Sequence, residues 1–170
     1  MSKVLRGLAI AVLLVTVIGA GVVLYGLTMF EPQVESVAVT ATPAMQAQDA
    51  FDAVLSQIAS GTFTGRQFGS VDALRAEDCT FLTYTVRLTN KGFFPAEWIS
   101  LAVDPLQSAD GLSRDVLQLG DDGAYVLAQG GTGDMMATIL RVGDAADTRR
   151  LLTVSSYVFG QKTEVPVWAE

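Results

Sequence analysis

The sequence predicts a mainly β protein, an antiparallel sandwich with one accessory amphipathic helix, carried behind one N-terminal transmembrane helix. Three observations predict this fold class. Residues 7–30 contain no charged side chain and are almost entirely apolar. Residues 44–60 place apolar side chains at helical spacing. From residue 62 onward, short apolar stretches with period-two alternation are separated by turn residues, as in antiparallel sandwiches and barrels.

The apolar run is long enough to cross a bilayer. Uncharged apolar segments of about 18 or more residues span the hydrocarbon core as helices that satisfy their own backbone hydrogen bonds. Lys3 and Arg6 precede the run and Glu31 follows it, so the N-terminus is expected in the cytoplasm. A cleaved signal peptide is the alternative, but its apolar core is only about 7–15 residues long. We therefore expect an uncleaved signal anchor at the cell membrane, with Tyr25 near its outer interface.

The chain is expected to divide into four segments. These are a cytoplasmic tail over residues 1–6, the transmembrane anchor over 7–30, a strand and amphipathic helix over 31–61, and an extracytoplasmic β-sandwich over 62–170.

The segment after the anchor reads as a strand followed by a helix. Val34–Ala41 carries valines in loose alternation. Thr42 is expected to cap the following helix, with Pro43 at its first position and Gly61 at its end. The polar face of this helix lacks Lys and Arg, which favours packing on the domain over lying on a membrane surface.

The remaining segments read as strands. Thr80–Asn90 is the clearest, because Leu82, Tyr84, Val86 and Leu88 share one face. Asn90 and the residues after it make the turn. The other expected strands are 62–68, Trp98–Val103, a hairpin of 116–119 with 124–128, Met135–Val142, and a final pair of 151–159 with 163–168, into which Trp168 should pack.

Composition excludes several function classes. All 18 acidic side chains but only 9 of the 11 basic ones follow residue 30, which argues against a nucleic-acid partner. There is no histidine, so Ser-His-Asp and Cys-His catalysis and His-containing zinc sites are excluded. Cys79 is the only cysteine and is expected to be buried, the alternative being an intermolecular disulfide. No cofactor is expected.

One stretch resembles a known group of modules. The segment Tyr84–Gly92, followed by Pro95–Ile99, resembles immunoglobulin-like and fibronectin-III-like bacterial surface modules. The Gly-rich segment 129–133 before Met135–Val142 is similar to a later turn of that group, although the Pro-Gly usual there is missing. The resemblance covers about residues 80–168 and implies an Ig-like sandwich that serves as a spacer, adhesion unit or docking surface.

The candidate partner-contact residues are Phe93, Phe94 and Trp98, an aromatic cluster beside the turn. Aromatic side chains of this kind can anchor a protein partner. They also cap sandwich cores routinely, and we favour that interpretation. The cluster is nevertheless the first place to look for an interface.

Three other site hypotheses are weaker. The acidic residues of the expected loops could bind calcium, but their spacing matches no EF-hand; they are Asp104, Asp110, Asp121, Asp122 and Asp134. The Gly130–Asp134 loop lacks the lysine and the following helix of a phosphate-binding loop. Glu97 and Asp104 fall on opposite strand faces, which makes a carboxylate-only hydrolase the least favoured alternative.

The sequence therefore predicts a non-enzymatic structural, adhesive or docking subunit of a cell-envelope assembly. Its expected partners are the lipid bilayer, through the N-terminal helix, and one or more proteins outside the membrane. A calcium- or small-ligand-binding sensor module using the acidic loops is the alternative.

Overall fold

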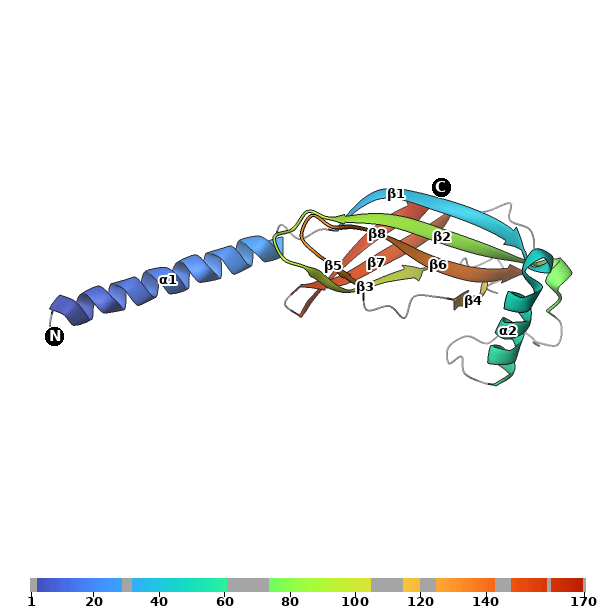
Figure 1. The fold of residues 1–170 in the computed structure, drawn as a ribbon, viewed down its shortest axis with the longest axis horizontal. Helices are drawn as coiled ribbons and strands as arrows, with labels where there is room; N and C mark the ends of the chain where they lie inside the picture. Colours follow the sequence, from blue (N-terminus) through green and yellow to red (C-terminus); the bar gives the residue numbers. More distant parts are fainter. Residues whose placement is uncertain are drawn as a thin grey trace.

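The computed structural model describes residues 3–28, 32–60, 74–104, 115–119, 125–142, 148–158 and 160–169. A long N-terminal helix projects from one end of a two-sheet domain, and a short helix packs at the opposite end (Figure 1). The predicted strand over 62–68 and the predicted helix stop at Gly61 lie outside the described residues.

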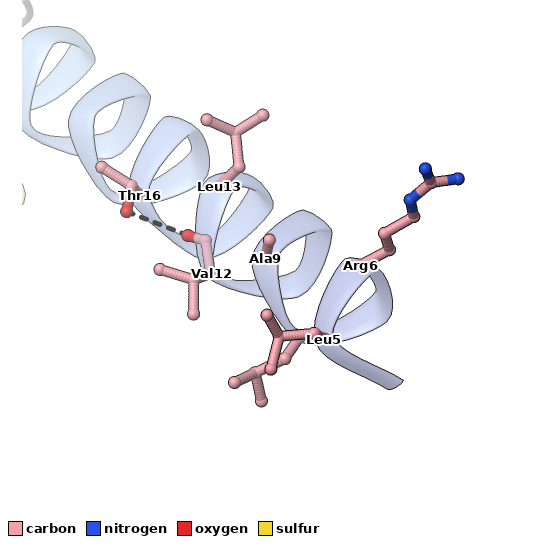
Figure 2. A pocket seen from close by; sticks show the side chains of 7 residues that line it. Leu5, Arg6, Ala9, Val12, Leu13 and Thr16 are labelled. Carbon is pink, nitrogen blue, oxygen red and sulfur yellow. Dashed lines mark hydrogen bonds between the residues drawn. The ribbon is translucent and has the colours of Figure 1, made fainter. Parts of the chain in front are cut away.

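The N-terminal helix α1 (Lys3–Thr28) is long and apolar enough to span a membrane over Leu5–Gly26. These 22 residues extend about 33 Å at 1.5 Å per residue, against a hydrocarbon core of about 30 Å. Figure 2 shows the first half of the helix, where Thr16 Oγ1 donates a hydrogen bond to the Val12 carbonyl oxygen at 2.9 Å. That hydroxyl is therefore satisfied within the helix, as an apolar environment requires.

Two four-stranded antiparallel sheets make up the domain, which confirms the predicted mainly β class. The first sheet has the order β1-β2-β6-β4, with β1 Pro32–Pro43, β2 Cys79–Asn90, β6 Thr132–Val142 and β4 Asp115–Leu119. The second has the order β5-β3-β7-β8, with β5 Tyr125–Leu127, β3 Ala96–Val103, β7 Arg150–Val158 and β8 Gln161–Ala169. Among the strands that the structure describes, β1 therefore lies at one end of the first sheet.

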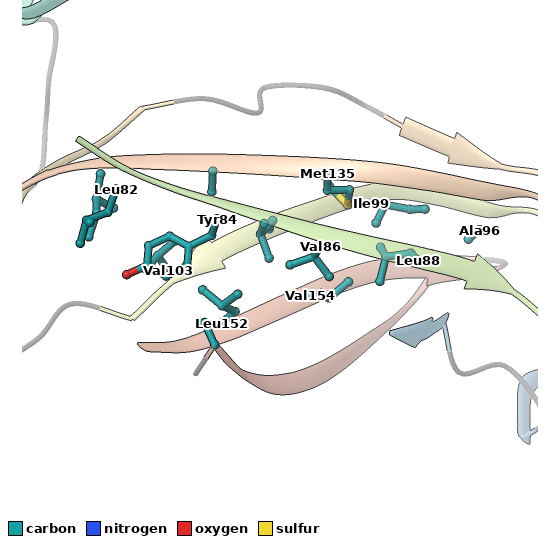
Figure 3. Packing of buried hydrophobic residues seen from close by; sticks show 14 of the residues in the cluster. Leu82, Tyr84, Val86, Leu88, Ala96, Ile99, Val103, Met135, Leu152 and Val154 are labelled. Carbon is teal, nitrogen blue, oxygen red and sulfur yellow. The ribbon is translucent and has the colours of Figure 1, made fainter. Parts of the chain in front are cut away.

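The main core lies between the two sheets (Figure 3). The predicted inner face of β2 is buried as expected, and it packs with residues of β6 from its own sheet and of β3 and β7 from the other. Tyr84 carries a polar group into this core, and its hydroxyl donates to the Thr148 carbonyl oxygen at 3.0 Å. The alternation of β2 therefore predicted the core correctly.

The short helix covers a second, smaller core. Helix α2 (Gln48–Ala59) follows a 3-10 turn η1 (Ala44–Ala47) and buries Phe51 and Val54 against Cys79 and its neighbours. This confirms that the helix packs on the domain and that Cys79 is buried. Burial raises the pKa of the Cys79 thiol, which keeps it protonated.

The predicted start of this helix is wrong. Thr42 and Pro43 are the last residues of β1, paired with Phe81 and Thr80 of β2, and no side chain caps the turn that follows. The capping pattern is local, whereas the β1–β2 pairing extends over the whole strand and fixes these two residues in the sheet.

The predicted hairpin of 116–119 with 124–128 is also wrong. Strand β4 pairs with β6 in the first sheet, and β5 pairs with β3 in the second. Two short strands on either side of turn residues show the same sequence pattern whether they pair with each other or with longer neighbours. The final pair is confirmed, since β7 and β8 pair antiparallel from Arg150↔Ala169 to Val158↔Gln161, and Gly160, just before β8, has φ +76°.

Candidate functional site

The helix α1 meets the domain at the tip turn, Lys91–Pro95, which joins β2 to β3. The Phe94 ring lies on Gly26, so closely that a Cβ atom added there would overlap the ring. The rings of Tyr25 and Phe93 lie 6.1 Å apart, tilted by 49°. Together the helix and the turn enclose an apolar groove lined by Ile18, Gly21, Val22, Tyr25, Phe93 and Phe94.

Asn90 holds the tip turn in place. Its side chain is fully buried, and Nδ2 donates to the carbonyl oxygens of Phe94 and Leu127, each at 2.9 Å. Oδ1 accepts a hydrogen bond from the Gly92 N–H at 2.9 Å. The amide therefore ties the tip turn to the end of β5 and leaves no part of itself unsatisfied. The sequence Asn90-Lys91-Gly92 predicted the turn. Nothing in it predicted the hydrogen bond from Asn90 to Leu127 of β5.

Phe93 and Phe94 have different environments. Phe94 is half-buried and packs against the main core, so the core interpretation holds for it. The Phe93 side chain is 61% exposed, and its ring meets α1 rather than the core. The core interpretation is wrong for Phe93 because the turn directs its side chain along the helix.

Trp98 lies on a β-bulge in β3. The one extra residue shifts the side chains that follow it to the opposite face of the sheet from the one that strict alternation would give. Ala96 pairs with Leu127 and Ile99 with Tyr125, so three steps along β3 match two steps along β5. Strict alternation from the buried Ala96 would send Trp98 into the core. The extra residue instead leaves Trp98 64% exposed and returns Ile99 to the core, so the core interpretation is wrong for Trp98 as well.

The bulge costs backbone strain. Trp98 has φ +51°, and it is the one non-glycine residue with positive φ among the described residues. Such a conformation costs a residue with a Cβ atom roughly 1–2 kcal/mol. It turns the indole to the outer face, where Val126 of β5 lies opposite the bulge and is 63% exposed. The fold thus maintains a strained backbone that presents an aromatic side chain to solvent.

Trp168 provides a contrast in the same sheet. It belongs to β8 as expected, but its side chain is 55% exposed instead of packed into the strand pair. The Arg149 guanidinium lies 5.0 Å from the indole centroid, a cation–π contact within the chain. Trp168 therefore already has a partner over its ring, and its backbone is not strained.

The acidic residues do not gather into one site within the described part of the chain. Asp134 lies on β6 and accepts two hydrogen bonds from the Arg87 guanidinium, at 2.7 and 2.8 Å, which lowers the pKa of its carboxyl group. Asp104 follows β3 and is exposed. Asp110, Asp121 and Asp122 lie outside the described residues. Among those that are described, no three His, Cys, Asp or Glu side chains are placed to hold a metal ion.

The Gly-rich segment is a turn into a strand. Gly130 has φ +69°, and its N–H donates to the Asn90 carbonyl oxygen at 2.8 Å, while the Asn90 N–H donates to Gly131 at 2.9 Å. Strand β6 begins immediately afterwards at Thr132, which confirms a structural turn leading into a strand. Glu97 lies on the bulge, and Asp104 lies just beyond the far end of the same strand, which keeps these carboxylates apart.

Comparisons of the chain with protein-family models, with curated proteins and with solved structures found no match.

Proposed function

We propose that this protein is a single-pass membrane subunit whose N-terminus is cytoplasmic and whose Ig-like β-sandwich lies outside the membrane, where it docks a protein partner without catalysing a reaction. The observation that carries the proposal is the bulge at Trp98. The left-handed backbone conformation of Trp98 costs roughly 1–2 kcal/mol and leaves the residue 64% exposed, so the strained bulge presents most of the indole to solvent instead of burying it. Aromatic side chains of this kind are enriched among residues that dominate binding.

The surroundings of Trp98 support a protein partner. Val126, opposite the bulge, adds exposed apolar area on β5, which is the last strand of its sheet as described. Glu97, on the same bulge, is exposed and gives the patch a polar rim. An apolar centre with polar surroundings at a sheet edge is typical of protein interfaces.

The junction with α1 supports a positioning role. Phe94 contacts Gly26 on one side and the main core on the other, so the end of the helix and the domain are packed together. A domain held in this way presents the Trp98 surface in a defined orientation to the membrane. The absence of histidine from the sequence and its single, buried cysteine agree with a subunit that works through contacts.

The proposal is tested by the native mass of the full-length protein after gentle detergent extraction from its own membrane. Wild type should form a discrete complex with another chain at a fixed ratio. Trp98→Ala should release that chain, whereas Trp168→Ala, which truncates an equally large and similarly exposed side chain, should retain it. A monomeric wild type, or release by both variants alike, contradicts docking through Trp98.

A further inference from the structure

The proposed function requires that α1 spans the membrane. In that case the groove between α1 and the tip turn lies within the bilayer, where only lipid is available to fill it. Tyr25 follows Arg6 by 19 residues, which is about 28 Å along a helix and close to the thickness of the hydrocarbon core. With Arg6 at one interface, Tyr25 therefore reaches the other. Tyrosine is enriched at that level of a membrane protein.

The tip turn reaches the same level. The Phe93 ring lies 6.1 Å from the Tyr25 ring, so the two aromatic side chains share one depth. The groove continues downward from them to Ile18, about 10 Å closer to the bilayer centre at the rise of an α-helix. None of the lining residues that the structure describes is charged. Water and soluble proteins are therefore poor occupants of its lower part.

The charge around the turn agrees with this placement. The domain is acidic overall, yet its only two lysines lie at the end where the tip turn is: Lys91 is on the tip turn, and Lys162 is near the start of β8, opposite Tyr157 and ion-paired with Glu164. Lys91 is exposed and two residues from Phe93. Lysine beside an inserted aromatic ring suits the level of lipid headgroups, where its ammonium group stays in water.

We propose that the tip turn is a second membrane contact of this protein. Phe93 inserts at the interface of the leaflet on the domain's side, and the groove between Phe93, Phe94 and α1 holds an acyl chain of a phospholipid from that leaflet. The domain thus contacts the bilayer directly through the tip turn, in addition to being connected to it through α1.

Depth-dependent fluorescence quenching tests the proposal on the full-length protein in phospholipid vesicles. Trp98→Phe and Trp168→Phe remove the native tryptophans, both of which are more than half exposed. In that background, Phe93→Trp and Tyr25→Trp each place one reporter, and lipids brominated near the top of the acyl chain serve as the quencher. The chain that keeps only Trp98 is the control for a solvent-facing site.

The expected result is that the Phe93→Trp reporter is quenched as strongly as the Tyr25→Trp reporter and several-fold more than Trp98. Quenching of the Tyr25→Trp reporter alone would overturn the second contact while leaving the anchor intact. Loss of quenching at both positions would overturn the anchor, and the second contact with it. Quenching of the Phe93→Trp reporter that falls as the protein-to-lipid ratio rises would assign the groove to another copy of the chain and overturn the lipid assignment.

Discussion

Replacing Trp98 by glycine and by alanine separates its backbone strain from its role in docking. In an ordinary strand, alanine is more stable than glycine by about 0.5–1 kcal/mol because glycine has more freedom to lose. At φ +51° the order should reverse, since a Cβ atom costs roughly 1–2 kcal/mol in this region and glycine carries none. Trp98→Gly should therefore be the more stable variant by about 1 kcal/mol.

Both variants also lose the buried part of the indole. About a third of this side chain is covered, which corresponds to roughly 80 Å² of a tryptophan and about 2 kcal/mol at 25 cal/mol per Å². We expect Trp98→Ala to lie about 2 kcal/mol below wild type and Trp98→Gly about 1 kcal/mol below it.

Urea unfolding of the full-length protein in a mild detergent, followed by far-ultraviolet circular dichroism, measures both values. Partner binding should be lost equally in the two variants, because both lack the indole. An alanine variant as stable as the glycine variant refutes the strain argument. If partner binding were instead stronger in the more stable glycine variant than in the alanine variant, Trp98 would contribute to binding only by stabilising the fold.

Three further perturbations probe the junction and the sheet. Asn90→Ala leaves two carbonyl groups and one N–H without their partner and should lower the free energy of unfolding by about 3 kcal/mol in the same urea assay; a loss below about 1 kcal/mol contradicts the account of the tip turn. Gly26→Ala should destabilise the domain by about 1–3 kcal/mol through overlap with the tip turn, whereas Gly21→Ala, where a Cβ atom meets nothing, should not. The pKa of the Asp134 carboxyl, measured by NMR, should lie below its ordinary value and rise in Arg87→Gln. Because the folded-state pKa is depressed, the pair stabilises the protein above the unfolded-state pKa of about 3.9, and this contribution is lost as pH falls through the folded-state value.

Local periodicity predicted the elements whose environment follows from their own residues. The alternation of β2 identified its buried face, and the uncharged run identified α1. The spacing of apolar residues in α2 identified a helix that packs on the domain, because a stripe of this width needs a partner. The fold class followed from the number and spacing of the short strands.

Features that depend on pairing between distant segments were not predicted. The bulge at Trp98 follows from the match between β3 and its neighbours, and a single strand read alone gives the wrong face for the indole. The end of β1 is fixed by its pairing with β2, which overrides a local capping pattern. The contact between Gly26 and Phe94 joins residues 68 positions apart, so no local pattern announces it.

Site-specific photo-crosslinking in intact membranes tests the central claim most directly. A photoreactive amino acid at position 98 of the full-length chain should give one crosslinked product of fixed mass, and the same amino acid at position 168, on β8 of the same sheet, should not give it. That result would establish the Trp98 surface as a docking site on a membrane-held domain. No product from position 98, or the same product from both positions, would contradict the account.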